Sequence, residues 1–255
     1  MGSGFLLDDR VAVITGGGTG IGRQIALTLS GAGAVVLLAG RDETNLTAAV
    51  AAVREAGSVA DAFGTDVADP VAVERLLARA VELHGRVDIL VNNAGQFGNS
   101  PAEEMSNEDW RRVIDVNLSG TYWCCRTFGQ HMLDRGTGAI VNVASISGVI
   151  VNTPQPQIAY NVSKAGVIML TRSLAAEWAP RGVRVNAVSP GYIATTGTVA
   201  GAETPGRGER WRSLTPMGRM GTLDEIARAV QNLASDDAGY TTGANLIVDG
   251  GYTLW

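Results

Sequence analysis

Short apolar runs alternate along the chain with longer stretches in which apolar residues recur at helical spacing. Each short run stops at glycine or at small polar residues, which is typical of a buried strand. We predict strands at residues 11–14, 34–39, 58–64, 87–91, 139–144, 183–188 and 244–249. We predict helices at residues 21–30, 43–56, 70–84, 106–133, 160–178 and 222–234.

Residues at the helix boundaries support these limits. Pro70 stands at the first-turn position that proline favours, and Ser106 with Asp109 resembles a capping box. Thr222 or Asp224 is expected to cap the last helix.

The alternation predicts the fold class. Continuously apolar strands between helices indicate a parallel sheet covered on both faces, so we expect a single doubly wound α/β domain of the Rossmann type over residues 1–255. Residues 195–215 show little periodicity, and we expect an irregular segment there with a mobile substrate lid at 196–215. In such folds ligands bind at the carboxyl ends of the strands.

Composition excludes several function classes. Twenty-five acidic and twenty basic residues give a net charge of −5 without a basic run, so nucleic acid is not an expected partner. No apolar run reaches membrane-spanning length, and the N-terminus does not resemble a signal peptide. Cys124 and Cys125 are expected to be buried and reduced, which suits the cytoplasm. No metal site is expected.

A glycine cluster follows the first predicted strand. Thr15 to Gly22 has the pattern T-G-x-x-x-G-x-G, which differs from the G-x-G-x-x-G spacing. A strand, a glycine turn and a helix place backbone N–H groups and a helix N-terminus against a phosphate. The cluster therefore favours a nucleotide site, although glycines alone can also mark a structural turn.

A second cluster lies at residues 145–164. Tyr160 and Lys164 stand four apart on a predicted helix, hence on one face. We expect the ammonium to lower the pKa of the phenol, which can then act as a general acid or base. Taken alone, such a pair is more often a surface contact between helix side chains. Ser145 and Ser147 on the preceding loop can hold a carbonyl oxygen.

These motifs together resemble the short-chain dehydrogenase/reductase family over essentially the full chain. The resemblance rests on Thr15–Gly22, N-N-A-G at 92–95, Asn117, the serine after the fifth strand, Tyr160–Lys164 and P-G-x-x-x-T at 190–195. The stretch around 144–164 looks like a branch of polyol and ketose dehydrogenases and carbonyl reductases.

The resemblance implies an oxidoreductase that transfers hydride between a nicotinamide dinucleotide and a secondary alcohol or ketone. The implied catalytic residues are Asn117, Ser145, Tyr160 and Lys164. The implied cofactor residues are Gly16, Gly18, Thr19, Gly20, Ile21, Arg41, Asp66, Val67, Asn93, Ala94, Gly95, Tyr160, Lys164, Pro190, Gly191, Ile193 and Thr195. Ser145 is also expected to contact the substrate, and further candidate contacts are Gln96, Ser147, Gln155, Tyr192 and Trp211, each of which can instead be loop packing.

The resemblance also implies a homotetramer, with one interface built from the helices at 106–133 and 158–178. A catalytically inactive dinucleotide-binding regulator or scaffold is the alternative, but it should lack one of the four catalytic residues. Nothing favours a lyase or an isomerase on this fold.

The cofactor is predicted to be NADP(H), with NAD(H) as the alternative. An acidic residue after the second strand binds the ribose of NAD, whereas arginine accommodates the phosphate of NADP. Gly40 takes the acidic position and Arg41 follows it. A shift of one residue would instead bring Asp42 there, and Thr19 replaces a second basic residue of many NADP-dependent relatives.

Ser145 rather than Ser147 is predicted to be the catalytic serine. Spacing from Tyr160 favours Ser147, whereas position after the strand, in an S-x-x-G pattern, favours Ser145. The strand end is rigid, and the loop at 149–157 can absorb an insertion at little entropic cost.

Overall fold

A seven-stranded parallel sheet forms the centre of the computed structural model, which describes residues 6–255. The strand order is β3-β2-β1-β4-β5-β6-β7. The strands are β1 Val11–Thr15, β2 Val35–Gly40, β3 Ala60–Gly64, β4 Ile89–Asn92, β5 Gly138–Val143, β6 Val183–Pro190 and β7 Asn245–Val248. All seven predicted strands are therefore present, with boundaries shifted by a few residues. The N-terminal prediction falls partly on residues 1–5, which lie outside the described residues.

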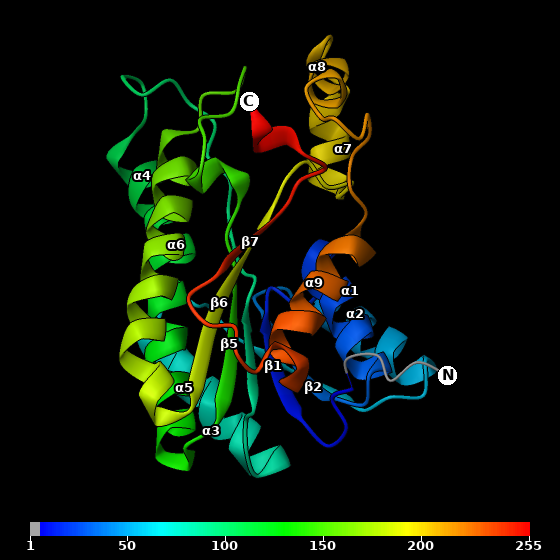
Figure 1. Ribbon diagram of the computed structural model, residues 1–255, viewed down its shortest axis with the longest axis vertical. Helices are drawn as coiled ribbons and strands as arrows, with labels where there is room; N and C mark the ends of the chain where they lie inside the picture. Colours follow the sequence, from blue (N-terminus) through cyan, green and yellow to red (C-terminus); the bar gives the residue numbers. More distant parts are fainter. Residues whose placement is uncertain (1–5) are drawn as a thin grey trace.

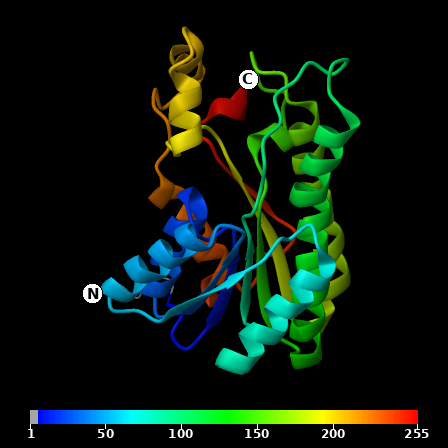
Figure 2. The same cartoon turned by 180° about the vertical axis from the view of Figure 1, so that it is seen from behind.

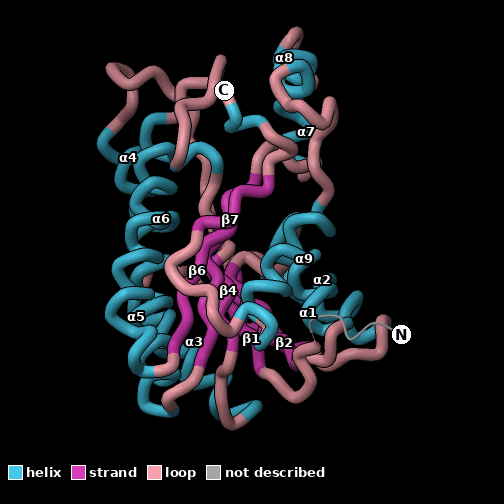
Figure 3. The backbone as a smooth tube through the Cα atoms, viewed as in Figure 1, coloured by secondary structure: helices cyan, strands magenta, loops and turns pink. Residues whose placement is uncertain are grey.

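Helices cover both faces of the sheet (Figures 1 and 3). On one face lie α1 Gly20–Gly31, α2 Glu43–Glu55 and α9 Leu223–Ala234, and on the other lie α3 Pro70–His84, α5 Gly120–Arg135 and α6 Ile158–Trp178. A hydrophobic cluster lies on each side of the sheet. One contains the fully buried Ile14 and Ile25, and the other contains the fully buried Leu90 and Phe128. The single doubly wound domain is confirmed.

The sheet reverses its strand order beside β1. β1 pairs with β2 on one side and with β4 on the other, so the loops that follow β1 and β4 diverge from a common point. Ligand sites in doubly wound sheets lie at such a switch point.

The predicted helix at 106–133 is interrupted. It consists of α4 Asn107–Ile114, a π-helical turn at Asp115–Ser119 and α5, and the Gly120 N–H donates to Asp115 O five residues earlier. The predicted helical stretch is confirmed, and it contains a one-residue insertion, the π turn, that hydrophobic spacing did not reveal. Asn117 lies inside this turn and is completely buried.

The segment at 195–215 is not irregular, contrary to prediction. It forms α7 Thr196–Ala202 and α8 Arg207–Ser213, which stand apart from the sheet beyond the carboxyl ends of the strands (Figures 1 and 2). Thr195 caps α7 by accepting from Thr198 N, and Trp211 anchors α8 with only 5% of its surface exposed. Helices this short carry too little periodicity to be recognised.

The structure also tests the residues predicted at the starts of helices. Asp69 caps α3 with Pro70 at its first turn, and Thr222 forms a capping box with Glu225 at the start of α9. Short 3₁₀ turns lie at Ile146–Gly148, Ala179–Arg181, Asp236–Ala238 and Tyr252–Leu254.

Cys124 and Cys125 are buried free thiols, and burial raises the pKa of both. Within residues 6–255, none of the helices combines the length and apolarity needed to cross a bilayer.

Candidate active site

Tyr160 lies on the first turn of α6, with 8% of its surface exposed. Ser145, which directly follows β5 and Ala144, forms a side-chain hydrogen bond with the phenol. The ring of Phe97 packs against the Tyr160 ring at a centroid separation of 4.6 Å. The hydroxyl thus sits between a hydrogen-bond partner and an apolar wall.

Lys164 lies one helical turn further along α6, where its buried ammonium donates to Val143 O at 2.7 Å. Its Nζ is 5.7 Å from the centroid of the Tyr160 ring. Burial lowers the pKa of Lys164 to about 8. Lys164 is also the only lysine in the chain.

The expected lowering of the tyrosine pKa was wrong. Burial raises the pKa of Tyr160 to about 12, and the hydrogen bond from Ser145 offsets only part of that rise. The phenolate loses its hydration, and an ammonium nearly 6 Å from the ring centroid does not restore it.

Asn117 is held by the loop that follows β4. Its Oδ1 accepts from Gln96 N at 2.7 Å, and its Nδ2 donates to Gln96 O at 2.9 Å and to Ser163 Oγ at 3.1 Å. A Cβ on Gly95 would lie 3.5 Å from Asn117 Oδ1 and 3.7 Å from Lys164 Nζ. The π turn, the loop after β4 and α6 therefore meet around one lysine.

The two serines have different partners. Ser145 Oγ accepts from Ser147 N at 3.1 Å and bonds to the phenol of Tyr160. Ser147 Oγ instead accepts from Asn152 Nδ2 at 2.7 Å and from Gln157 Nε2 at 3.0 Å. The arrangement suits Ser145 as the partner of the tyrosine and ties Ser147 to the following loop.

The glycine cluster packs directly against the loop after β4. Gly16 has a φ of +63°, and a Cβ there would approach Asn93 Nδ2 to 2.8 Å. Asn93 Nδ2 donates to Thr15 O and Gly16 O, and Thr15 Oγ1 accepts from the N–H groups of Asn93 and Ala94. Asn93 therefore shapes the loop.

A cavity of about 140 Å³ lies at the carboxyl ends of β1 to β4. Its walls combine glycine backbone, a cation and a carboxylate: Gly16, Gly40, Arg41, Thr65, Asp66, Val67, Ala94, Gly95, Gln96 and Val116. The N-terminus of α1, with Gly18, Thr19, Gly20 and Ile21 around it, opens at the same edge. Backbone donors beside small residues fit the phosphates and adenosine of a dinucleotide.

The side chains of Arg41 and Asp42, at the end of β2, have different roles. Gly40 is the last strand residue, and the exposed Arg41 lines the cavity. Asp42 caps α2, its carboxylate accepting from Asn45 N at 2.9 Å and from Asn45 Nδ2 at 2.8 Å. The Asp42 carboxylate is thus engaged within its own helix.

On the other side of the site, β6 ends at Pro190. A Cβ on Gly191 would lie 2.7 Å from Asp249 Cα, so only glycine fits there. Ile193 is buried, and Thr195 begins α7.

The proposed substrate contacts fall into two groups. Gln155 Nε2 donates to Tyr192 Oη at 3.0 Å, and the Tyr192 ring stacks on Trp211 at 4.2 Å. Gln96 Oε1 instead accepts from Arg112, so its side chain is drawn to the surface. The sequence did not point to Asn152, Gln157, Phe97 or Ser163, because loop residues and helix interiors carry no spacing signal for a site.

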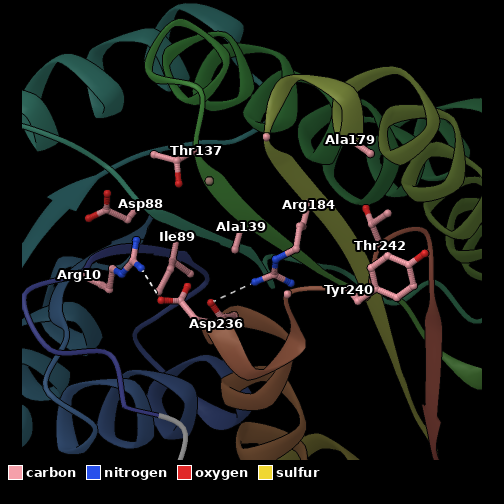
Figure 4. Close-up of a pocket in the computed structure, with 14 residues that line it drawn as sticks. Arg10, Asp88, Ile89, Thr137, Ala139, Ala179, Arg184, Asp236, Tyr240 and Thr242 are labelled. Atoms are coloured by element: carbon pink, nitrogen blue, oxygen red, sulfur yellow. Dashed lines mark hydrogen bonds and ion pairs between the residues drawn. The ribbon is translucent and has the colours of Figure 1, made fainter.

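A larger cavity of about 540 Å³ lies at the opposite, amino end of the strands (Figure 4). Arg10 forms an ion pair with Asp236 at 2.7 Å there, and Arg184 donates to Leu233 O and Ser235 O at the end of α9. It contains none of the residues around Tyr160.

Comparison with known proteins identifies the family. A family model described as enoyl-(acyl carrier protein) reductase matches residues 15–253. The galactitol 2-dehydrogenase of Rhizobium johnstonii is 47% identical over 98% of both chains.

Two solved structures are similar over 98% of both chains. The crystal structure of gox2181 has a TM-score of 0.97 with 46% identity. That of a gluconate 5-dehydrogenase from Burkholderia cenocepacia in complex with NADP and tartrate has a TM-score of 0.93 with 34% identity. The chain, with its phenol, serine and lysine at the carboxyl edge of the sheet, belongs to the short-chain dehydrogenase/reductase family and is an oxidoreductase acting on alcohols.

Proposed function

We propose that this protein is an NADP-preferring dehydrogenase that interconverts a secondary hydroxyl of a polyol and the ketone of the corresponding ketose. The observation that carries the proposal is the buried Tyr160 phenol, hydrogen-bonded to Ser145 and one turn from Lys164. The similarity to a galactitol 2-dehydrogenase supports the substrate class.

Each catalytic residue has one task in this proposal. Tyr160 is neutral at physiological pH, as an ordinary tyrosine also is, and its raised pKa makes the phenolate still less populated. It can therefore donate a proton to a ketone oxygen and must lose that proton before it can accept one from an alcohol. Ser145 orients the substrate oxygen as a fixed donor. Lys164 holds the dinucleotide ribose, and Asn117 positions a water that connects Lys164 to solvent.

A bound nicotinamide dinucleotide supplies or accepts the hydride. The glycine cluster would hold its phosphates, Asp66 and Val67 its adenine, and the residues from Pro190 to Thr195 its nicotinamide end. Arg41 would bind the phosphate of NADP, and the capping role of Asp42 removes the carboxylate that would favour NAD.

We also propose a cytoplasmic homotetramer. The buried reduced cysteines suit a reducing compartment. Tyr122 on α5 and Val162 and Met169 on α6 are exposed apolar side chains on the helices of the expected interface.

The test is a spectrophotometric assay of galactitol oxidation with NADP and with NAD. We expect kcat/KM to be higher with NADP than with NAD. Arg41→Ala should lower kcat/KM with NADP much more than kcat/KM with NAD. Tyr160→Phe keeps the ring and removes the proton donor, so it should reduce turnover by about 10²–10⁴-fold while leaving cofactor binding nearly intact. A clear preference for NAD, or a tenth of wild-type turnover in Tyr160→Phe, would contradict the proposal.

A further inference from the structure

Buried polar atoms without a hydrogen-bond partner gather on the substrate side of the active site. Of six such side-chain atoms among residues 6–255, four belong to this region: Asn152 Oδ1, Gln155 Oε1, Arg207 Nε and Trp211 Nε1. Leaving a buried donor or acceptor unpaired is costly, and native proteins contain few of them. A local cluster of four therefore points to a ligand that supplies the missing partners.

The four residues come from two segments that contact each other. Asn152 and Gln155 lie on the loop at 149–157, while Arg207 and Trp211 lie on α8. Gln155 binds Tyr192, whose ring stacks on Trp211. Arg210 Nη2 also donates to Thr153 Oγ1 at 3.2 Å, so α8 is tied to the loop a second time.

The cluster is connected to the reacting centre. Asn152 Nδ2 donates to Ser147 Oγ, and Ser147 N donates to the Oγ of Ser145, the partner of Tyr160. Ser147 Oγ already accepts two hydrogen bonds, which occupy both of its lone pairs. Its own proton is therefore directed elsewhere, and Ser147 can act toward a substrate only as a donor.

The chemistry of the unpaired atoms is mixed. Asn152 and Gln155 contribute acceptors, whereas Arg207 and Trp211 contribute donors. A hydroxyl donates one hydrogen bond and accepts others, so neighbouring hydroxyls can satisfy both kinds. A carboxylate would pair with Arg207 but would leave the two amide oxygens facing negative charge.

We propose that Asn152, Gln155, Arg207 and Trp211, with Ser147 as an oriented donor, form a subsite for the hydroxyls of a neutral polyol beyond its reacting carbon. This inference rests on the proposed function and adds the groups that select the substrate. A simple secondary alcohol would leave the subsite unpaired, and sites built to bind a hydroxyl reject analogues that lack it.

The test compares kcat/KM for galactitol, D-gluconate and 2-hexanol with NADP. Trp211→Phe removes the indole N–H and keeps an aromatic ring for stacking, and Gln155→Met removes the amide at similar length. Each variant should lower the preference for galactitol over 2-hexanol by about tenfold, while NADPH binding followed by fluorescence stays unchanged. Val151→Ala is the matched control, because Val151 is on the same loop with 78% of its surface exposed.

The outcomes separate the two proposals. A wild-type preference for galactitol that both variants retain in full would overturn the subsite alone. A wild-type preference for D-gluconate would overturn the subsite and its selection of neutral substrates, as would a preference for 2-hexanol. Failure to oxidise any alcohol would overturn the proposed function together with the subsite.

Discussion

Burial acts in opposite directions on the two titratable side chains of the site. It raises the pKa of Tyr160 to about 12 and lowers that of Lys164 to about 8, because each group favours its neutral form when water is removed. The tyrosine is therefore a proton donor at rest. The lysine remains mostly charged at pH 7, and its buried charge lowers the free energy of unfolding.

Lys164→Met should raise the melting temperature of the cofactor-free protein at pH 7 by a few degrees. A shift from 10.5 to about 8 corresponds to about 3 kcal/mol, part of which the lost bond to Val143 O offsets. Between these pKa values the unfolded chain binds a proton that the folded chain has released, so wild-type stability gains with rising pH. The gap between variant and wild type should thus shrink from pH 7 to pH 10 in calorimetry.

The lysine pKa can also be read directly. Since the chain has one lysine, labelling with ¹³Cε-lysine gives a single NMR resonance. We expect its titration midpoint near 8, and a midpoint above 10 would show that the ammonium is not desolvated as the structure indicates.

Substitution of the two serines should separate their roles. Ser145→Ala removes the partner of the phenol and should lower kcat at least tenfold, with a full loss of a preorganised donor being worth about 2.7–4 kcal/mol. Ser147→Ala leaves that bond in place and should mainly raise KM. Steady-state kinetics with galactitol distinguish them, and the reverse pattern would assign catalysis to Ser147.

At the scale of elements, α7 and α8 differ from the rest of the fold. Of their residues only Gly208 and Trp211 are buried, so little apolar burial stabilises this segment locally. It is held to the body of the protein through the Tyr192–Trp211 stack and the Arg210–Thr153 bond.

Hydrogen exchange should show faster amide exchange at residues 196–215 than in the strands, with protection increasing when NADP and galactitol bind. The physical reason is that ligand contacts would add to few existing ones. Helix α1, whose inner face is buried, serves as an internal control within the same experiment. Equal protection of residues 196–215 in both states would exclude a lid.

The elements also show what a sequence can reveal. Strands and long amphipathic helices were predicted because their apolar periodicity extends over many residues, and the motifs mark the ends of those strands. The π turn around Asn117 was missed because one inserted residue shifts the phase of the apolar pattern only once, and imperfect helical spacing hides a single shift. The predicted direction of the Tyr160 pKa shift was wrong. The motif gives the spacing between Tyr160 and Lys164 along the helix, but it does not give the degree to which Phe97 and the loop bury the phenol.

At the scale of the whole molecule, the two faces of the sheet are covered but the outer surfaces of α5 and α6 are not purely polar. Met169 has 58% of its surface exposed, Val162 44% and Tyr122 39%. Exposed apolar groups on neighbouring helices are suited to contact a second copy of the chain.

If the proposed tetramer forms through these helices, Met169→Glu should reduce the mass measured by light scattering after gel filtration to that of a smaller species than the wild type. A charge in an apolar interface lacks a partner and its hydration. Val199→Glu is the control. It also replaces an exposed apolar residue by glutamate, but on α7, and it should leave the mass unaltered. A tetramer that tolerates Met169→Glu would place the interface elsewhere.

The reversal of strand order beside β1 has a consequence for the nascent chain. Val11 finds its partner Val35 early, but Ala12 pairs on the other side with Ile89, 77 residues later. A ribosome that adds about 5–20 residues per second leaves that edge of β1 without its neighbour for about 4–15 s. An unpaired apolar strand edge is a template for association with other chains. This edge of β1 is thus open to association with other chains during synthesis, until β4 has emerged from the ribosome.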